Sequence, residues 1–409
     1  MISVVKGGLT AVPGFRATGV RTGIKHRGLD FFLLASEKGS VPSAGLFTSN
    51  KVKGAPIQVT QKNLEDQKLG AIVANSGCAN AYTGKTGLKN AEKMTKLTAR
   101  ALDMDPDDVG VASTGLIGTQ LPMDLIQEGV DKALETLSNT WEAGENAAKA
   151  LMTTDTMVKE IAVETDLEDG TKVTIGGAAK GAGMIHPDLQ ATMLAFITTD
   201  AYITPAGLKS ALKKSVDQSF NMVSIDRDTS PNDMVIALAN GLANNERITR
   251  KHPSKKFQEG LDKVTTELAK KIAKDGEGAK HFIRVRVEGA KNLENARLAA
   301  RAVAGSNLVK AAVFGNDPNW GRIVTALGYS GASFKPEKVS ISVRSEGKEA
   351  PVVLDGEGLP GESLNQASKI MDSDEIEIYI KLDSGKGAAT AWGCDLTKEY
   401  VEINSKYST

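Results

Sequence analysis

The spacing of apolar residues in the first part of the chain predicts short strands and helices in alternation. Residues 71–77 (AIVANSG) form an apolar run that ends in a turn, which is typical of a buried strand. Residues 87–102 repeat apolar side chains three and four positions apart, and 123–137 do the same behind Pro122, so both segments are expected to be helices. This mixture indicates a fold that combines helices with sheets.

The middle of the chain predicts a hairpin, a buried strand and a long helix. Two strand-like runs within 159–178 meet at Asp169 and Gly170, a pair that favours a tight turn. Residues 193–201 (MLAFITTDA) are expected to be a buried strand, and 254–276 an amphipathic helix that stops at its terminal Gly.

The pattern of apolar and polar residues changes in the last third of the chain. Strand-like and helical patterns alternate there in short segments, at 281–290, 294–306, 338–344, 363–371 and 375–383. We therefore expect two domains, a larger one over 1–279 and a smaller α+β domain over 280–409. Hairpin signals argue against a sheet of parallel strands alone.

Composition narrows the classes of function. In 409 residues, 50 Lys and Arg balance 50 Asp and Glu, which gives no electrostatic reason to expect nucleic acid or an anionic membrane as a partner. No apolar stretch approaches the roughly 20 residues of a membrane span. The N-terminus lacks the features of a signal peptide, and Cys78 and Cys394 form no metal-ligand cluster. These features predict a cytoplasmic protein without a metal or other cofactor.

One stretch, HPDLQATMLAF at 186–196, has the features of a self-cleavage site. A Thr hydroxyl is a weak nucleophile that needs a base. If the bond between Ala191 and Thr192 breaks, the freed α-amine, with a pKa of about 7.7 to 8, can be that base. The small residues of the Gly-rich segment 176–184 would leave room for the Thr192 hydroxyl to attack the Ala191 carbonyl. An ordinary turn before a strand is an alternative explanation.

Two further segments could bind or stabilise negative charge. Lys180, within the Gly-rich segment, could bind a substrate carboxylate or a developing oxyanion, or it could be a solvated loop side chain. Thr114 and Gly115 end a predicted strand, and a hydroxyl and a backbone N–H there could both donate to one oxygen, as in an oxyanion hole. A simple strand-to-helix turn would contain the same residues.

Three other motifs give weaker indications of a functional site. NSGCANAYTG at 75–84 lacks the spacing and the terminal Lys-Ser/Thr of a phosphate-binding P-loop. Residues 224–234 and 314–323 are rich in Asp and Asn, and the carboxylates at 226, 228 and 233 could suggest a metal, but the Gly and Glu of a calcium-binding EF-hand loop are missing. Asp and Asn in such runs usually build turns, which is the favoured interpretation.

Several of these stretches together resemble the ArgJ family, whose members are glutamate N-acetyltransferases, also called ornithine acetyltransferases, of arginine biosynthesis. The resemblance runs from near residue 5 to the C-terminus. It implies a self-processing Thr-nucleophile fold, with a four-layer αββα core and a smaller C-terminal domain. The matching stretches, in family order, are NSGCANAYTG, STGLIG, MTTDT, KGAGMIHPDLQATML, IDRDTSPND, DGEGAKH and FGNDPNWGRI.

The resemblance also implies residue roles. Thr192 corresponds to the nucleophile, cleavage falls between Ala191 and Thr192, and Thr114 and Gly115 correspond to the oxyanion hole. The substrate-binding positions implied are Thr154, Lys180, Thr192, Glu277, Asn404 and Thr409.

The implied reaction is a ping-pong transfer of acetyl from N-acetylornithine to glutamate through an acetyl ester on Thr192. Some family members also take acetyl from acetyl-CoA. Acetyl-CoA would then be a second substrate, and no cofactor is expected. Cleavage would give an α chain of 1–191 and a β chain of 192–409, which are expected to pair as an α2β2 heterotetramer.

Two positions depart from the family pattern, and two other functions are alternatives. The loop PDLQAT carries one residue more than usual before the Ala-Thr pair, and Pro231 stands where a second Thr is common. A Thr-nucleophile aminopeptidase or amidase would share the self-cleavage but release the acyl group to water. A non-catalytic small-molecule binding protein would keep one intact chain.

Overall fold

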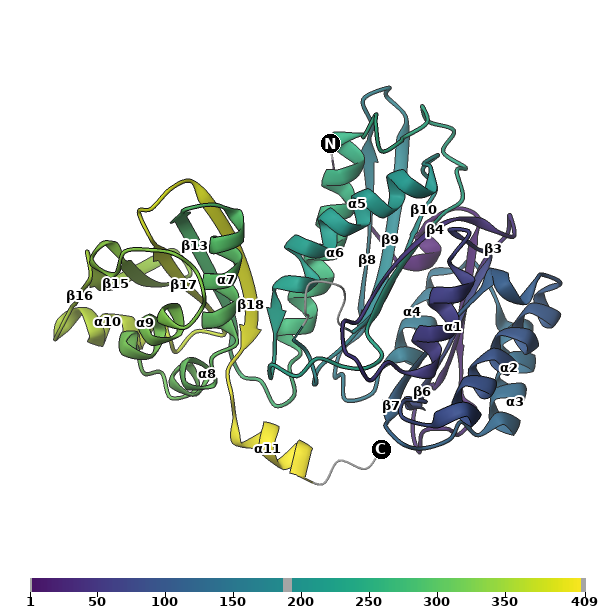
Figure 1. Cartoon of the computed structure of the whole chain (residues 1–409), viewed down its shortest axis with the longest axis horizontal. Coiled ribbons are helices and arrows are strands. Elements are labelled where there is room, and N and C mark those ends of the chain that lie inside the picture. The colour runs from purple at the N-terminus through teal and green to yellow at the C-terminus, as the bar shows by residue number, and fades with distance from the viewer. Residues whose placement is uncertain (1, 187–192, 406–409) are drawn as a thin grey trace.

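The computed structural model describes residues 2–186 and 193–405, and its first layer is a mixed seven-stranded sheet (Figure 1). The hairpin predicted around Asp169 and Gly170 is present between β8 and β9, and β10 runs antiparallel to β9 and parallel to β12. The strands, in spatial order, are β1 (Ile2–Val5), β8 (Lys159–Asp166), β9 (Lys172–Lys180), β10 (Leu194–Thr199), β12 (Met234–Ala239), β4 (Val41–Phe47) and β5 (Lys68–Leu69).

A four-stranded sheet packs face to face against this layer. Its strands, in spatial order, are β2 (Phe15–Val20), β3 (Phe31–Ser36), β6 (Ala71–Cys78) and β7 (Val109–Leu116). Phe32 of β3 and Phe196 of β10 stack between the two sheets, with ring centroids 5.0 Å apart. Every residue of β3 is buried, because one of its faces meets the other sheet and the opposite face meets helices.

Helices cover both outer faces of the paired sheets. Helices α1 (Ala55–Asn63), α2 (Gly84–Leu102) and α3 (Met123–Thr136) pack on the four-stranded sheet, and α5 (Pro205–Gln218) and α6 (Lys255–Lys274) pack on the seven-stranded one. Helix α4 (Trp141–Leu151) contacts β2 and β3. This order of layers confirms the αββα core expected from the sequence.

Local sequence signals explain where several of these helices begin. The Thr204 hydroxyl accepts a hydrogen bond from the Gly207 N–H at 3.2 Å, and Pro205 occupies the first helical position of α5. Ser254 caps α6 in the same way, with the Phe257 N–H donating at 3.0 Å. The first half of the Gly-rich segment forms the end of β9, which extends to Lys180, two residues beyond the strand predicted within 159–178.

A second seven-stranded sheet forms the C-terminal part of the chain, and α7 (Leu293–Ala304), α8 (Asn307–Phe314), α9 (Trp320–Gly328) and α10 (Glu362–Ile370) accompany it. One strand, β11, comes from an earlier part of the chain and pairs in parallel with β18. The strands, in spatial order, are β11 (Val223–Ser224), β18 (Gly387–Cys394), β13 (Phe282–Ala290), β17 (Glu375–Lys381), β14 (Ser340–Ser345), β15 (Lys348–Leu354) and β16 (Glu357–Gly358).

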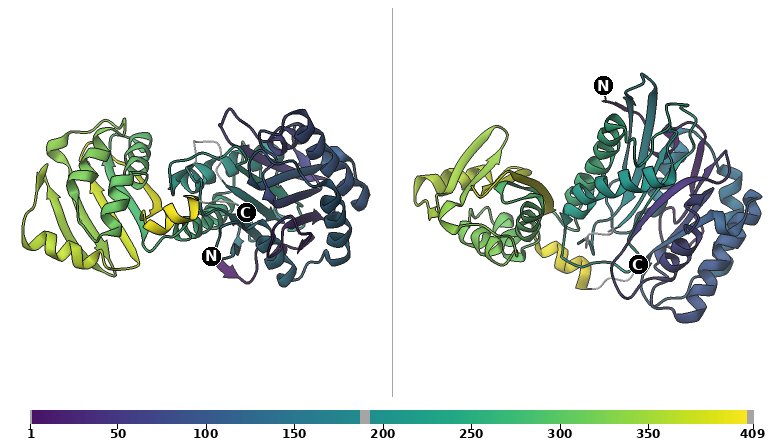
Figure 2. Two further views of the ribbon diagram at one scale, coloured as in Figure 1. Left: turned by 90° about the horizontal axis from the view of Figure 1, so that it is seen from below. Right: turned by 45° about the horizontal axis from the view of Figure 1, so that its top comes forward.

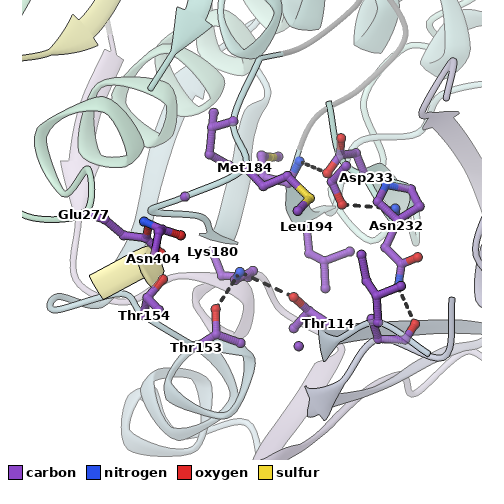
Figure 3. A pocket seen from close by; sticks show the side chains of 18 residues that line it. Thr114, Thr153, Thr154, Lys180, Met184, Leu194, Asn232, Asp233, Glu277 and Asn404 are labelled. Carbon is purple, nitrogen blue, oxygen red and sulfur yellow. Dashed lines mark hydrogen bonds between the residues drawn. The ribbon is translucent and has the colours of Figure 1, made fainter. Parts of the chain in front are cut away.

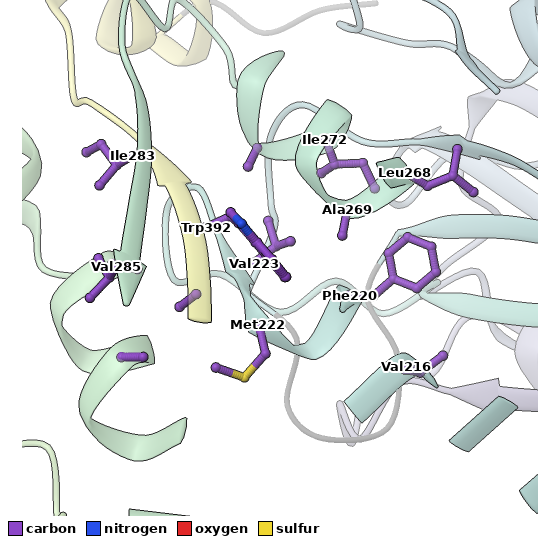
Figure 4. Packing of buried hydrophobic residues seen from close by; sticks show 14 of the residues in the cluster. Val216, Phe220, Met222, Val223, Leu268, Ala269, Ile272, Ile283, Val285 and Trp392 are labelled. Atoms are coloured by element: carbon purple, nitrogen blue, oxygen red, sulfur yellow. The ribbon is translucent and has the colours of Figure 1, made fainter. Parts of the chain in front are cut away.

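One continuous apolar cluster joins the C-terminal sheet to the core. Phe220 and Met222, which follow α5, and Ile272 of α6 belong to the same buried cluster as Ile283 of β13 and Trp392 of β18 (Figure 4). Because this contact is apolar and buried, it holds the two parts of the chain together.

The end of the chain returns from the C-terminal sheet to the core. Helix α11 (Lys398–Ser405) extends away from β18 toward the αββα layers (Figures 1 and 2). At its start, the Thr397 hydroxyl donates to the Gly278 carbonyl at 2.8 Å, and the Tyr400 hydroxyl donates to Asp226 Oδ2 at 3.2 Å. These contacts direct the end of α11 to the pocket described below. Among residues 2–186 and 193–405, no helix has the length and apolar composition to cross a membrane.

Candidate active site

A pocket of about 170 Å³ lies where the strand ends of the two core sheets meet α11 (Figure 3). It is smaller than the roughly 300 to 1,000 Å³ of sites that hold drug-sized ligands, so its size suits a small metabolite. The residues that line it are Ala79, Thr114, Gly115, Ile117, Thr153, Thr154, Lys180, Gly183, Met184, Ile185, Met193, Leu194, Ser230, Pro231, Asn232, Asp233, Glu277 and Asn404.

The structure gathers most of the site residues predicted from the sequence. Every predicted position that it describes lines this one pocket, namely Thr114, Gly115, Thr154, Lys180, Glu277 and Asn404. Ala191, Thr192 and Thr409 lie outside the described residues, so the predictions for them stay predictions. Met193, the next residue after Thr192 in the sequence, also lines the pocket.

Thr114 and Gly115 lie at the end of β7, and only Gly fits the second position. Gly115 has a φ of +128°, and a Cβ on it would approach the backbone carbon of Gly77 on the neighbouring strand β6 to 2.3 Å. The Thr114 hydroxyl accepts a hydrogen bond from Lys180 Nζ at 3.4 Å, which leaves its own proton free to be donated elsewhere. Thr114 and Gly115 both line the pocket, and their role as an oxyanion hole stays a prediction.

Lys180 is the last residue of β9, and it is buried rather than solvated, with 10% of its side chain exposed. Its ammonium donates to the Thr153 hydroxyl at 2.9 Å (Figure 3). It also lies 3.9 Å from Asp155 Oδ2. The loop interpretation of Lys180 was thus wrong. A partly desolvated ammonium that faces a small pocket can attract a ligand carboxylate.

A buried ion network holds Lys180, and sequence reasoning missed it. Asp155 accepts hydrogen bonds from Lys159 Nζ at 2.7 Å and from the Gly181 N–H at 2.6 Å. Burial alone would raise the pKa of Asp155, but the charges of Lys180 and Lys159 hold the pKa of this carboxyl well below its usual range. Lys159 also pairs with Asp275, so two cations and two carboxylates balance one another beneath the pocket. The signals in the sequence were Asp155 of MTTDT and Asp275 of DGEGAKH, but neither motif shows that the two carboxylates share Lys159.

Glu277 and Asn404 form the opposite wall. Asn404 Nδ2 donates to Glu277 Oε2 at 2.7 Å, and the Glu277 N–H donates to the Ala182 carbonyl at 2.9 Å. A Cβ on Gly183 would come within 2.4 Å of the Glu277 carboxyl, so the absence of a side chain there makes room for this carboxylate. Asn404 lies in the last turn of α11, which is hydrogen-bonded to Glu277 at the pocket.

The Asp- and Asn-rich runs form local turns and caps, as expected, and Asp226 also bonds to a distant segment. Asp226 accepts from the backbone N–H groups of Met184 at 2.6 Å, Ile185 at 2.9 Å and Asp228 at 3.1 Å. In the second run, Asn319 caps α9. Within the described residues, no three His, Cys, Asp or Glu side chains are arranged to hold a metal ion.

Asn232 and Asp233 line the pocket and were not predicted as functional. Asn232 Nδ2 donates to the Ser113 carbonyl at 2.7 Å, and Asp233 Oδ1 accepts from the Met193 N–H at 2.7 Å. Their motif had been interpreted only as a turn, because nothing local in SPND shows that its side chains reach two other strands.

Residues 16–409 match the family model described as the ArgJ family. The chain belongs to the ArgJ family. The "Arginine biosynthesis bifunctional protein ArgJ" of Symbiobacterium thermophilum is 48% identical over 412 residues, covering 98% of this chain and 99% of that protein. The "Glutamate N-acetyltransferase" of Methanothermobacter thermautotrophicus is 45% identical over 408 residues, covering 99% and 98%.

Solved structures of ArgJ proteins also match part of the chain. A crystal structure of ArgJ from Bacillus halodurans is 40% identical and covers 46% of this chain and 98% of its own, with a TM-score of 0.44. The ornithine acetyltransferase of Mycobacterium tuberculosis, solved in complex with ornithine, is 39% identical over 46% of this chain and 99% of its own, with a TM-score of 0.43. All the pocket residues of this ArgJ-family chain lie inside the range that the family model matches.

Proposed function

We propose that this chain transfers the acetyl group of N2-acetyl-L-ornithine to L-glutamate, giving L-ornithine and N-acetyl-L-glutamate. The relatives named glutamate N-acetyltransferase support the reaction. The observation that carries the proposal is the shared pocket: a cation, an oxyanion-type Thr-Gly pair and the Glu277–Asn404 pair surround the residue that follows Thr192 in the sequence.

The first step proposed is self-cleavage. The Thr192 hydroxyl attacks the Ala191 carbonyl, the peptide nitrogen leaves as the α-amine of Thr192, and water then hydrolyses the ester that joins the two residues. The products are chains of 191 and 409 − 191 = 218 residues. The new α-amine, with a pKa of about 7.7 to 8, is a base beside its own hydroxyl.

Acetyl transfer then follows in two halves. The Thr192 oxygen attacks the acetyl carbonyl and passes its proton to the α-amine, while the Thr114 hydroxyl and the Gly115 N–H donate to the oxyanion. The ornithine amine takes a proton and leaves, so an acetyl ester remains on Thr192. The glutamate α-amine attacks this ester, and the Thr192 oxygen is protonated as N-acetylglutamate departs. Exclusion of water between the halves prevents loss of the acetyl group.

Lys180 explains how one site can bind both amino-acid substrates. N2-acetylornithine and glutamate share an α-carboxylate, and the buried ammonium of Lys180 is the nearest cation to Thr114 among the pocket residues described. Glu277, Asn404 and Thr154 would contact the rest of the substrate, together with Thr409. Acetyl-CoA is proposed as a second donor because several relatives are named bifunctional, and an α2β2 assembly of the cleaved chains is proposed from the family resemblance.

The proposal can be tested by intact-mass analysis and a transfer assay on the same preparation. We expect two chains, a β chain that gains one acetyl group when N2-acetylornithine is added, and loss of that group to glutamate. Thr192→Ala, which should stay a single inactive chain, is the control. Acetate release that does not depend on glutamate would indicate the amidase alternative. Full-length wild-type protein that still transfers acetyl would contradict the self-cleavage step.

A further inference from the structure

The four residues from Ser230 to Asp233 connect the two sheets at the pocket. They immediately precede β12, in the seven-stranded sheet, yet they also reach the end of β7 in the four-stranded sheet. Thr114 and Gly115 are on β7, whereas Met193, which adjoins Thr192, immediately precedes β10. The relative position of these two segments decides whether a nucleophile and an oxyanion hole can act on one carbonyl.

Asn232 ties this connection to the oxyanion side. Its Nδ2 donates to the Ser113 carbonyl at 2.7 Å and also to the Ala79 carbonyl, and only 5% of the residue is exposed. Ser113 is the residue before Thr114, so the amide of Asn232 holds the backbone from which the Thr114 hydroxyl projects. The Ser113 hydroxyl in turn donates to Asn75 on β6 at 2.7 Å, which fixes this strand end further.

Asp233 ties the same connection to the other side. Its Oδ1 accepts from the Met193 N–H at 2.7 Å, and the Met193 carbonyl accepts from the Met234 N–H at 2.7 Å. Met193 has a φ of +82°, which is unfavourable for a residue with a side chain, so outside contacts must hold it there. The Met193 N–H belongs to the peptide bond that joins Met193 to Thr192.

Burial of the Asp233 carboxyl lowers the stability of the fold, and a turn alone does not require this burial. The residue is 2% exposed, and its Oδ2 has no hydrogen-bond partner among the described residues. Burial raises the pKa of this carboxyl well above its ordinary value, although the Met193 N–H, Ser230 and the charge of Lys180 oppose the rise. Taking a carboxyl out of water lowers the stability of a fold, and this carboxyl lies in the pocket lining, bonded to the Met193 N–H.

We propose that Asp233 is a positioning residue for acetyl transfer. It holds the backbone next to Thr192 in place relative to Thr114 and Gly115, while Asn232 holds the strand end that carries this pair. This inference rests on the proposed function. The essential property of Asp233 is a side-chain oxygen that accepts from the Met193 N–H at 2.7 Å. Asn keeps such an oxygen on a side chain of the same size, and Ala does not.

The test compares Asp233→Ala with Asp233→Asn in the full chain, with Asp228→Asn as the matched control. Asp228 is exposed and belongs to the same Asp-rich run, but it does not line the pocket. The readouts are the time course of chain cleavage and the rate at which the processed β chain gains acetyl from N2-acetylornithine, measured by mass and divided by the amount of processed chain. This division removes the effect of poorly folded protein.

For Asp233→Ala we expect the acetylation rate to fall by about tenfold to a hundredfold with little change in KM, because misplacement of reacting groups by an ångström has effects of this size. Asp233→Asn should recover most of the rate, and Asp228→Asn should stay within about twofold of wild type. If Asp233→Ala remains uncleaved, the cleavage time course gives the same comparison with Asn. If Asp233→Ala does not fold, Asp233→Leu, whose side chain has a similar shape but no acceptor oxygen, takes its place.

Two results would overturn the inference: wild-type rates for Asp233→Ala, or a loss in Asp233→Asn as large as that in Asp233→Ala. Failure of the proposed function gives a different pattern, because the wild-type protein itself would then not move acetyl to glutamate. In that case the cleavage time course still tests whether Asp233 positions the segment after Thr192.

Discussion

The buried pair of Asp155 and Lys159 should contribute far more to stability than an exposed pair of the same chemistry. Asp155 Oδ1 and Lys159 Nζ are 2.7 Å apart, four positions apart in sequence, and both side chains are 0% exposed. Lys213 and Asp217 form a matched pair with the same spacing and a distance of 2.8 Å, but their side chains are 61% and 18% exposed. The two pairs differ in burial, and the buried pair also has further partners: Gly181 and Lys180 contact Asp155, and Asp275 contacts Lys159.

We therefore compare Asp155→Asn with Asp217→Asn. The first change leaves a buried ammonium with one carboxylate fewer, and breaking a buried pair in this way destabilises a protein by about 3 to 5 kcal/mol. The second should lower the free energy of unfolding by less than about 1 kcal/mol, because water screens the exposed pair. Denaturant unfolding measures both, in a Thr192→Ala background so that each sample contains one uncleaved chain.

The stabilising effect of Asp155 should also depend on pH. The folded-state pKa of Asp155 is depressed, so its stabilising effect is present above the unfolded-state pKa of about 3.9 and is lost as the pH falls toward the folded-state value. The difference in stability between wild type and Asp155→Asn should therefore shrink below that pH. Equal losses for the two Asn variants, or a difference that does not change with pH, would refute the argument.

Four further predictions concern the pocket and α11. Thr114→Ala should lower kcat by on the order of 10²- to 10³-fold with a smaller rise in KM, because the hydroxyl is proposed to act on the oxyanion; steady-state kinetics that show mainly a KM effect would contradict this. Lys180→Ala should chiefly raise KM for both amino-acid substrates, and an unchanged KM would remove its proposed role. Deletion of 404–409 should leave cleavage intact on a gel but lower kcat/KM by about ten- to a hundredfold, since the buried Glu277 carboxyl loses the Asn404 donor, and an unpaired buried polar group costs roughly 1 to 3 kcal/mol. Tyr400→Phe, which removes the donor to Asp226 at 3.2 Å, should have a weaker effect of the same kind; equal activity of the truncated and full-length chains would refute both tail predictions.

The sequence alone determined the elements whose signals are local. The period of apolar residues identified α2, α3 and α6, and a turn pair identified the β8–β9 hairpin, because these patterns depend only on neighbours along the chain. The motif order identified the family and six of the residues that line the pocket. The roles of those residues remain predictions.

Tertiary structure decided what those residues contact. Lys180 looked like a loop residue because glycines surround it, yet strand pairing buries it beside Asp155 and Thr153. Asn232 and Asp233 looked like a turn, but their side chains bond to backbone groups more than 35 positions away in sequence. Such contacts leave no periodicity in the sequence, because the partners become neighbours only when the two sheets and α11 pack together. The sequence therefore determined which chemical groups are available, and the packing of the layers determined which of them meet.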